Sequence, residues 1–144
     1  MSILTLHRNQ AFKLSIPYWV FINEQPVAVM QQKEMSIQMP DGEYNLGIRV
    51  IFGLPKWQLY IGDSKKITLT DNQQLHLKIT DKERWWNILF DIDLVFCIVK
   101  FFISFSNPWN IIYEIISNGF FILWIIRILL IRKNYFKIVN YTEL

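Results

Sequence analysis

Hydrophobic and polar residues alternate with a period of two over much of the first 80 residues. Successive side chains of a β-strand point to opposite faces, so this alternation predicts strands with one buried face. The clearest runs are Met35–Met39, Tyr44–Val50, Trp57–Ile61 and Leu75–Ile79. Turn residues such as Pro40-Asp41-Gly42 separate them. About six to eight short strands at this spacing predict a small antiparallel β-sandwich over residues 1–80.

One predicted strand is apolar on both faces. Residues 16–22 read Ile-Pro-Tyr-Trp-Val-Phe-Ile, without the polar alternation of the other runs. One interpretation is a strand that protein covers on both sides. The other is that Trp19 and Phe21 form a candidate docking surface for lipid, for the helices of the chain or for another subunit.

Two short motifs lie at residues 20–27, Val-Phe-Ile-Asn-Glu-Gln-Pro-Val, and at residues 40–44, Pro-Asp-Gly-Glu-Tyr. Together they resemble the PEGA-type β-sandwich domain. That family has a strand of the form V-x-I-(D/N)-G-x-x-V, then a Pro-x-Gly turn that leads into a strand beginning with tyrosine. Residues 20–27 are similar to the first of these, and Pro40-Asp41-Gly42-Glu43-Tyr44 to the second. Glu24 stands where the family usually has glycine. The resemblance, over about residues 18–50, implies a small structural or binding module without catalytic residues.

The second half of the chain is much more apolar. Residues 85–106 contain 16 apolar residues out of 22, and residues 109–131 contain 17 out of 23. About 20 helical residues cross a bilayer core of roughly 30 Å, so each run is long enough to span. Between the runs, Ser106-Asn107-Pro108 is a turn signal.

This pattern predicts a transmembrane α-helical hairpin after the sandwich, and therefore an α+β fold class. The expected division of the chain is a β-sandwich at 1–80, a hairpin at 81–137 with helices at about 85–106 and 109–132, and a tail at 138–144.

Five charged residues interrupt the apolar runs, namely Asp91, Asp93, Lys100, Glu114 and Arg127. A charged side chain at the centre of a bilayer costs about 2.5–3.5 kcal/mol of insertion free energy. Lys100 lies seven residues before Asn107 and Glu114 lies seven after it, so an antiparallel hairpin places the two at the same depth. The other three fall toward the opposite end, where long side chains can reach the interface. We therefore expect Lys100 and Glu114 to offset each other's insertion cost.

Two alternatives place the apolar runs outside the bilayer core. They could be buried helices of a soluble protein, but so many apolar residues would need a large partner to cover them. They could also lie in the plane of the interface, yet Asp91, Asp93 and Lys100 do not gather on one polar helix face.

Basic residues flank the two runs, and the turn between them, residues 104–110, has no charge. The flanking residues are Lys82, Arg84, Arg132, Lys133 and Lys137. Because basic residues stay on the cytoplasmic side, this predicts a two-span membrane protein with both termini in the cytoplasm. Anionic lipid would be attracted by about 1 kcal/mol per basic charge.

Composition and motifs narrow the classes of function. The chain has 144 residues, is 52% hydrophobic and 19% charged, and carries a net charge of +3. His7 and His76 read as surface histidines and Cys97 as an inert thiol within an apolar run. The sequence shows no nucleophile with a base, no metal-ligand spacing and no phosphate loop, so we expect no cofactor and no enzymatic activity. Residues 1–80 carry only 8 basic against 6 acidic residues, which argues against nucleic-acid binding.

Three hypotheses for the function follow. The first is a non-enzymatic binding or scaffold module, tethered by the hairpin and associating with itself or with another protein. The second is an oligomeric channel or membrane-disrupting effector whose hairpins line a polar path through Lys100 and Glu114. The third is a membrane enzyme with Asp91 and Asp93 as metal ligands, although two carboxylates make a weak site.

Overall fold

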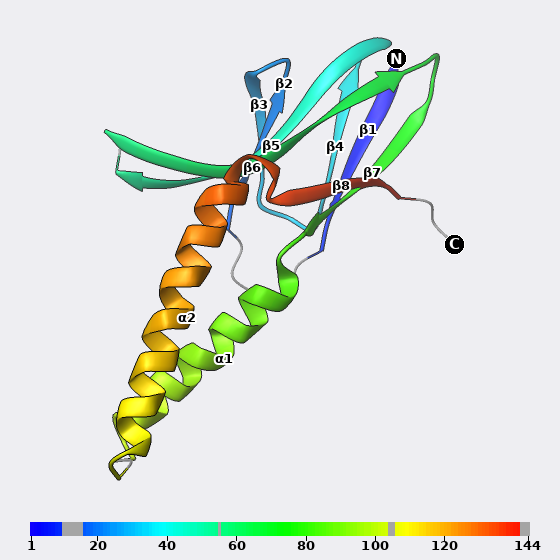
Figure 1. Ribbon diagram of the computed structural model, residues 1–144. Coiled ribbons are helices and arrows are strands. Elements are labelled where there is room, and N and C mark those ends of the chain that lie inside the picture. The colour runs from blue at the N-terminus through cyan, green and yellow to red at the C-terminus, as the bar shows by residue number, and fades with distance from the viewer. Residues whose placement is uncertain (10–15, 55, 104–105, 142–144) are drawn as a thin grey trace. The chain divides into compact units, whose positions relative to one another are not determined.

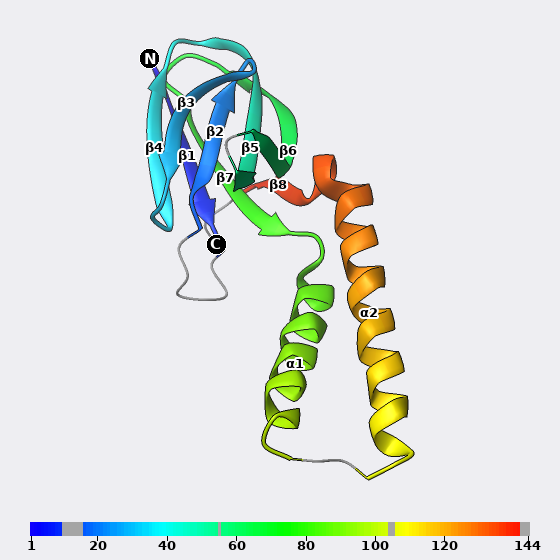
Figure 2. The ribbon, with the colours of Figure 1, turned by 90° about the vertical axis from the view of Figure 1, so that its left-hand side faces the viewer.

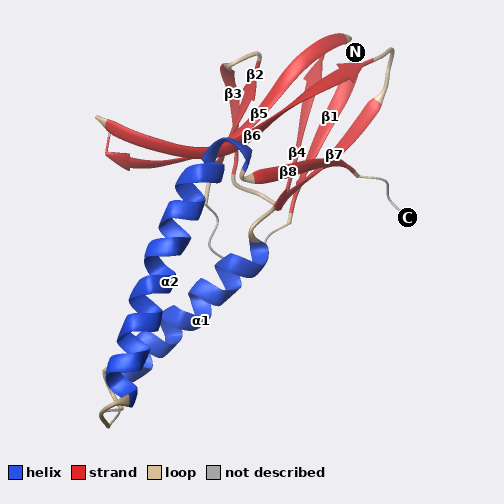
Figure 3. Cartoon of the chain, in the orientation of Figure 1, coloured by secondary structure: helices blue, strands red, loops and turns tan. Residues whose placement is uncertain are grey.

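The computed structural model describes residues 1–144 except 10–15, 55, 104–105 and 142–144, and it leaves the side chain of Leu54 undescribed. The elements of the described residues are β1 (Ser2–Arg8), β2 (Tyr18–Ile22), β3 (Gln25–Met30), β4 (Glu34–Met39), β5 (Gly42–Leu54), β6 (Trp57–Leu69), β7 (Gln74–Asp81), α1 (Arg84–Lys100), α2 (Trp109–Ile131), the 3₁₀ helix η1 (Arg132–Asn134) and β8 (Phe136–Asn140) (Figure 1). The fold is α+β, with most of its structure in strands (Figure 3).

The chain forms two compact units. Met1–Lys82 and Arg132–Leu144 make up one, which we call the β unit, and Glu83–Ile131 makes up the other, which we call the helical unit. The helical unit is thus an insertion, in sequence, between two parts of the β unit.

The β unit contains two four-stranded sheets. One has the strand order β4-β1-β7-β8 and the other β3-β2-β5-β6. Most neighbouring strands are antiparallel, as expected, but β1 and β7 are parallel, with Leu4 opposite Leu75 and Leu6 opposite Leu77. The prediction of a wholly antiparallel sandwich is therefore wrong at this pair. Alternation identifies a strand and its buried face, but it does not say which strand lies beside it.

The core of the β unit lies between the two sheets. Several strands bury alternate residues, as the period-two pattern predicts, among them Leu4 and Leu6 in β1 and Leu46 and Ile48 in β5, all without solvent exposure. The ring of Tyr18 in one sheet lies 5.0 Å from that of Phe136 in the other. Each fully buried side chain of this size stabilises the fold by about 1.5–3 kcal/mol. Burial also raises the pKa of the Tyr18 hydroxyl.

Strand β8 corrects the expected end of the domains. We predicted a hairpin up to residue 137 and a tail from 138, whereas Phe136–Asn140 is an edge strand paired with β7, from Asp81–Phe136 to Leu77–Asn140. Phe136 is 1% exposed and Ile138 is buried beside it. Five residues next to a long apolar run carry too short an alternation to be distinguished from the end of that run.

Two turns of the β unit explain residues that the sequence analysis singled out. Asn23 and Glu24, between β2 and β3, have φ angles of 50° and 65°. The side chain of Asn23 stabilises this turn by accepting a hydrogen bond from the main-chain N–H of Asn45, 2.9 Å away. Pro40 and Asp41 form the turn before β5, and the Tyr44 hydroxyl donates to the carbonyl oxygen of Pro40 over 3.0 Å. Glu24 thus adopts the left-handed backbone that glycine adopts more readily.

The helical unit consists of α1 and α2, which run antiparallel (Figure 2). The predicted bounds of the second helix agree with α2 to within a residue. The first helix ends at Lys100 rather than at 106. Phe101 and Phe102 donate main-chain hydrogen bonds to Ile98 and Val99, which tighten the last turn. Composition alone predicted a longer helix because residues 101–103 are as apolar as the helix itself.

Candidate functional site

The helical unit holds a row of polar contacts between α1 and α2. Four side-chain pairs join the helices or their ends, namely Glu83–Arg127, Asn87–Trp124, Asp93–Ser117 and Lys100–Glu114. We call these eight residues the polar seam. In an antiparallel helix pair, residues later in one helix lie opposite residues earlier in the other. The four pairs follow this order.

Lys100 and Glu114 form one end of the polar seam. The ammonium nitrogen of Lys100 lies 2.5 Å from a carboxylate oxygen of Glu114, so the spacing from Asn107 correctly predicted that they meet. The side-chain amide of Asn110 donates to the same carboxylate oxygen over 3.4 Å. The Lys100 ammonium also lies 5.4 Å from the centre of the Tyr113 ring. The Glu114 carboxylate thus has two polar partners, and the Lys100 ammonium has one carboxylate and one aromatic ring beside it.

Glu83 and Arg127 form the other end. The Nε and Nη2 atoms of Arg127 donate to the two carboxylate oxygens of Glu83 over 2.6 and 3.1 Å. The guanidinium also lies 5.1 Å from the centre of the Trp86 ring. We expected Arg127 to reach the interface by itself, and its partner Glu83 was not predicted. The count from Asn107 that paired Lys100 with Glu114 places Arg127 opposite Asn87, one helical turn from Glu83, so this signal was present in the sequence.

The middle of the seam combines polar and aromatic contacts. The Ser117 hydroxyl donates to a carboxylate oxygen of Asp93 over 2.9 Å. The indole N–H of Trp124 donates to the side-chain oxygen of Asn87 over 3.4 Å, and its rings stack on Phe90 with centroids 4.1 Å apart. A hydroxyl and an indole N–H both satisfy an acceptor that would otherwise be unpaired in an apolar medium.

Asp91 lies outside the polar seam. Its side chain is exposed, and no hydrogen bond or ion pair joins it to another residue that the structure describes. Asp93 contacts Ser117, so the two carboxylates are not brought to a common partner. Among the described residues there is no group of three or more His, Cys, Asp or Glu side chains placed to hold a metal ion. Cys97 is exposed on α1.

The outer surfaces of α1 and α2 are apolar and uncovered. Within Arg84–Lys100 and Trp109–Ile131 no residue is buried. Over the described residues one helix, Trp109–Asn134, is long and apolar enough to cross a bilayer, with a mean hydropathy of 1.9. We predicted two such spans, and α1 has 17 residues, four of them charged. The length and composition of the helices thus single out α2 alone.

The flanking basic residues have different environments. Lys82 lies 3.9 Å from a carboxylate oxygen of Asp63 in the β unit. Arg84 is exposed at the start of α1, and Arg132 and Lys133 are exposed in η1. Lys137 belongs to β8 and not to a helix flank, because β8 begins at Phe136.

Trp19 and Phe21 lie on the face of β2 that points away from the core. Trp19 is 36% exposed, so the interpretation of a strand covered on both sides is wrong for this residue. Phe21 is half-buried, because the guanidinium of Arg49 lies over its ring at 4.4 Å. Arg49 in turn forms an ion pair with Glu24. The contact of Arg49 with Phe21 could not be predicted from the local pattern, since Arg49 comes from another strand.

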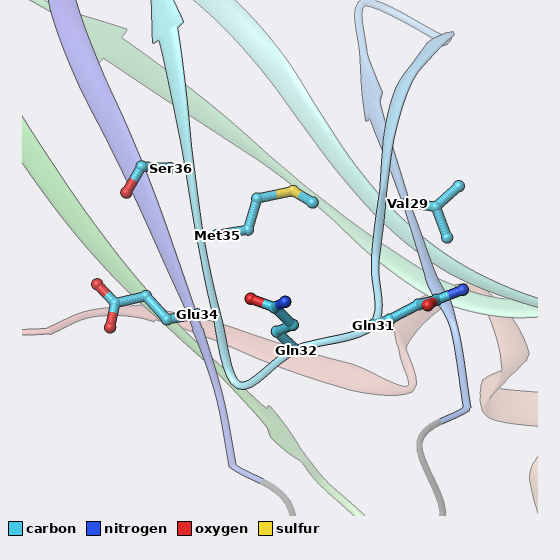
Figure 4. A pocket seen from close by; sticks show the side chains of 6 residues that line it. All are labelled: Val29, Gln31, Gln32, Glu34, Met35 and Ser36. Carbon is cyan, nitrogen blue, oxygen red and sulfur yellow. The ribbon is translucent and has the colours of Figure 1, made fainter.

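Two further places in the β unit contain polar side chains. A pocket of about 430 Å³ lies at the connection of β3 and β4, where Met35 points from β4 toward β3, and Glu34 and Ser36 lie on the other side of β4 (Figure 4). His7 and His76 form a hydrogen bond of 3.2 Å on neighbouring strands. Neither place joins a nucleophile to a base.

Arg8 is a buried charged residue that the alternation of the first strand does not predict. It is 8% exposed, its guanidinium lies 3.8 Å from the centre of the Tyr18 ring, and it donates to the carbonyl oxygen of Ile16 over 2.6 Å. These contacts give it a structural position between the sheets.

Comparison of the chain with protein-family models, with curated proteins and with solved structures gives no match.

Proposed function

We propose that the chain is a non-enzymatic integral membrane protein, in which the β unit is tethered to a bilayer by a two-span hairpin of α1 and α2. The observation that carries this proposal is the pairing of β8 with β7. It brings the chain back into the β unit after the helical unit. The main-chain N–H of Lys82 donates to the carbonyl oxygen of Tyr135 over 3.2 Å, so the two connections to the helical unit are neighbours.

This closure restricts the number of crossings. If α2 crossed a bilayer alone, β8 would be on the opposite side from β7 and the two could not pair. The helical unit therefore crosses twice or not at all. The apolar surface of α2, in which no residue of Trp109–Ile131 is buried, supports two crossings. At 1.5 Å per residue α2 is about 35 Å long and α1 about 26 Å, and 17 residues is at the lower limit for a span.

The polar seam supports the crossing of α1. Three of its charged residues, Asp93, Lys100 and Glu114, accept or donate hydrogen bonds within the helical unit. Internal pairing reduces the cost of placing such groups in hydrocarbon. Because basic residues flank the unit on the side of the β unit, the β unit and both described ends face the cytoplasm in this proposal.

The β unit acts as a binding or scaffold module in this proposal. Its support is the PEGA-like pair of motifs, which lie on the β2–β3 hairpin and on the turn into β5, where such motifs require a turn. The basic residues that flank the two helices, Arg84, Arg132 and Lys133, give the tether an affinity for anionic lipid.

Cysteine labelling in intact cells tests the two-span topology. In a C97S background, single cysteines at K66C and K137C in the β unit and N107C between the helices are treated with a membrane-impermeant thiol reagent. We expect labelling of N107C alone in intact cells and of all three after lysis. Labelling of all three in intact cells would overturn the cytoplasmic orientation. Equal protection of all three, with extraction of the chain by alkaline carbonate, would overturn the membrane proposal.

One observation favours an oligomeric membrane assembly as a second candidate. Asp91 is exposed on α1 and lies outside the polar seam, and a carboxylate on a membrane helix is stabilised by a polar partner. A second copy of the chain could supply that partner and, with several copies, a polar path. Mass measurement of the full chain in detergent tests this, because a monomer for wild type would exclude it. If wild type is oligomeric, D91L should lower the oligomer fraction and S117A should not.

A further inference from the structure

The β5–β6 hairpin extends beyond the sheet to which it belongs. Pairing of β2 with β5 ends at Trp19–Arg49, whereas pairing of β5 with β6 continues to Leu54–Trp57. We call residues 50–54 and 56–61 the arm; it extends away from the rest of the β unit in Figure 1. From Arg49 to Leu54 the ribbon is about 17 Å long at 3.3–3.4 Å per residue.

The arm is apolar on both faces and solvent-exposed. Phe52 and Leu59 are directly opposite each other, so they share a face, and each is 44% exposed. Tyr60, on the other face, is also exposed, and Trp57 near the tip is 82% exposed. A two-stranded ribbon is at best marginally stable in water. An ordered ribbon with this much exposed apolar surface indicates a contact with another apolar phase or surface.

The chemistry of the arm matches the surface of a bilayer. Residues 50–62 contain one charged residue, Lys56, and no acidic residue. Trp57 and Tyr60 have the amphipathic rings that are enriched at the level of the lipid headgroups. A lysine beside an aromatic residue can keep its ammonium among the phosphates while its stem stays in the apolar layer.

The base of the arm adjoins the points where the helical unit joins the β unit. The main-chain N–H of Tyr135, which follows η1, donates to the carbonyl oxygen of Gly62 over 2.9 Å. On the other connection, Lys82 lies 3.9 Å from Asp63. Gly62 also lies close to β5 at the base of the arm, since a Cβ there would lie 2.5 Å from the carbonyl oxygen of Ile48. The arm therefore begins beside the residues of the β unit from which the chain enters and leaves the helical unit.

We propose that the arm inserts its tip, around Trp57, into the headgroup layer of the bilayer that the helical unit spans. This inference rests on the proposed function and adds a second, peripheral contact with lipid. The arm would fix the orientation of the β unit on the membrane surface, whereas the helices alone only tether it.

The test places an environment-sensitive fluorophore on the arm of the full chain. In the C97S background, Q58C carries the label on the arm and Q32C, an exposed site in the β3–β4 connection, carries it as a control. The chain is reconstituted into vesicles of phosphatidylcholine and phosphatidylglycerol, with or without lipid that bears a headgroup-level nitroxide. We expect blue-shifted emission and at least about twofold quenching at position 58, as for a site inserted at the interface, and neither at position 32.

Two further variants and a vesicle-flotation measurement separate the outcomes. W57S should abolish the quenching at position 58, and V27S, at an exposed apolar residue outside the arm, should leave it unchanged. If the chain floats with vesicles but the label at 58 is not quenched, the arm proposal is overturned and the membrane proposal stands. If the chain does not float with vesicles, the membrane proposal itself fails. A blue shift without nitroxide quenching, lost when labelled chain is diluted with unlabelled chain, would assign the arm to a second copy and overturn insertion.

Discussion

Arg127 donates two hydrogen bonds to the two carboxylate oxygens of Glu83, over 2.6 and 3.1 Å. Lys100 and Glu114 make the corresponding ion pair at the other end of the helix pair. The helical unit is therefore closed at both ends by unlike charges, with Asn87, Asp93, Ser117 and Trp124 between them.

The two-point contact of Arg127 predicts that lysine cannot replace it. R127K keeps the charge but cannot donate in parallel to both oxygens of Glu83, so we expect a lower melting temperature of the helical signal in detergent. R127L should lower it further because Glu83 then has no cationic partner. R127L combined with E83L should recover part of the loss. Equal melting temperatures for R127K and wild type would contradict a role for the paired geometry.

The Lys100–Glu114 pair predicts a compensating double mutant. K100L and E114L each leave one charge without its partner in the apolar region, so each should reduce the fraction of chain that resists alkaline extraction. The double variant removes both charges and should restore the wild-type fraction or exceed it. K66L, at an exposed lysine of the β unit, is the control. Additive losses in the double variant would show that the two residues act independently.

Phe136 tests whether β8 belongs to the β unit. Its side chain is 1% exposed and contacts the ring of Tyr18 from the opposite sheet. F136A should lower the free energy of unfolding by about 3–5 kcal/mol, as expected for a large cavity in a core. V27A, at an exposed site, should change it by less than about 0.5 kcal/mol. Denaturant unfolding of the full chain in detergent, followed by the signal of the strands, measures both.

Substitution of Gly62 and of Gly119 by alanine should have opposite effects on stability. A Cβ at Gly62 would lie 2.5 Å from the carbonyl oxygen of Ile48, so G62A forces main-chain atoms apart and should destabilise the β unit by about 1–3 kcal/mol. A Cβ at Gly119 in α2 would meet no atom within 4 Å. G119A should be neutral or should stabilise the helix by up to about 1 kcal/mol. Thermal unfolding of the two variants distinguishes these results.

Asp41 predicts a pH dependence of the stability of the β unit. The hydroxyl of Ser2 donates to its carboxylate over 2.5 Å and holds the pKa of Asp41 below its ordinary value, with a smaller contribution from Asp71. A lowered pKa in the folded state means that the carboxylate stabilises the fold above its ordinary pKa and stops doing so as the pH falls below it. The difference in unfolding midpoint between wild type and D41N should therefore be full near about pH 6 and shrink toward about pH 3. A difference that grows at low pH would contradict this assignment.

Much of the β unit could be predicted from alternation alone. The runs at Met35–Met39 and Tyr44–Val50 fall within β4 and β5, and their buried positions agree with the pattern. The parallel contact of β1 with β7 could not be predicted, because side-chain period carries no information about the neighbouring strand. Strand β8 could not be predicted for the same reason, because it forms a strand by pairing with β7 and its own five residues carry too short a pattern.

The polar seam was partly predictable. Equal distances from the turn paired Lys100 with Glu114, since rise per residue is nearly constant along a helix. The Asp93–Ser117 and Asn87–Trp124 contacts involve uncharged partners, which a search for charges passes over. The cover of Phe21 by Arg49 depends on the register of β2 against β5, which alternation does not set.

The position of β8 at the end of its sheet has a consequence for the order of biosynthesis. Residues 1–82 leave the ribosome well before residue 136, and until β8 arrives β7 is an open edge with unpaired main-chain groups. In the proposed topology the helices enter the bilayer during this interval, so insertion comes before completion of the sheet. A nascent chain stalled at that stage would expose the unpaired edge of β7, which can pair with strands of other chains. Because the inserted helices hold this nascent chain at the membrane, its β7 edge is kept away from other chains in the cytosol.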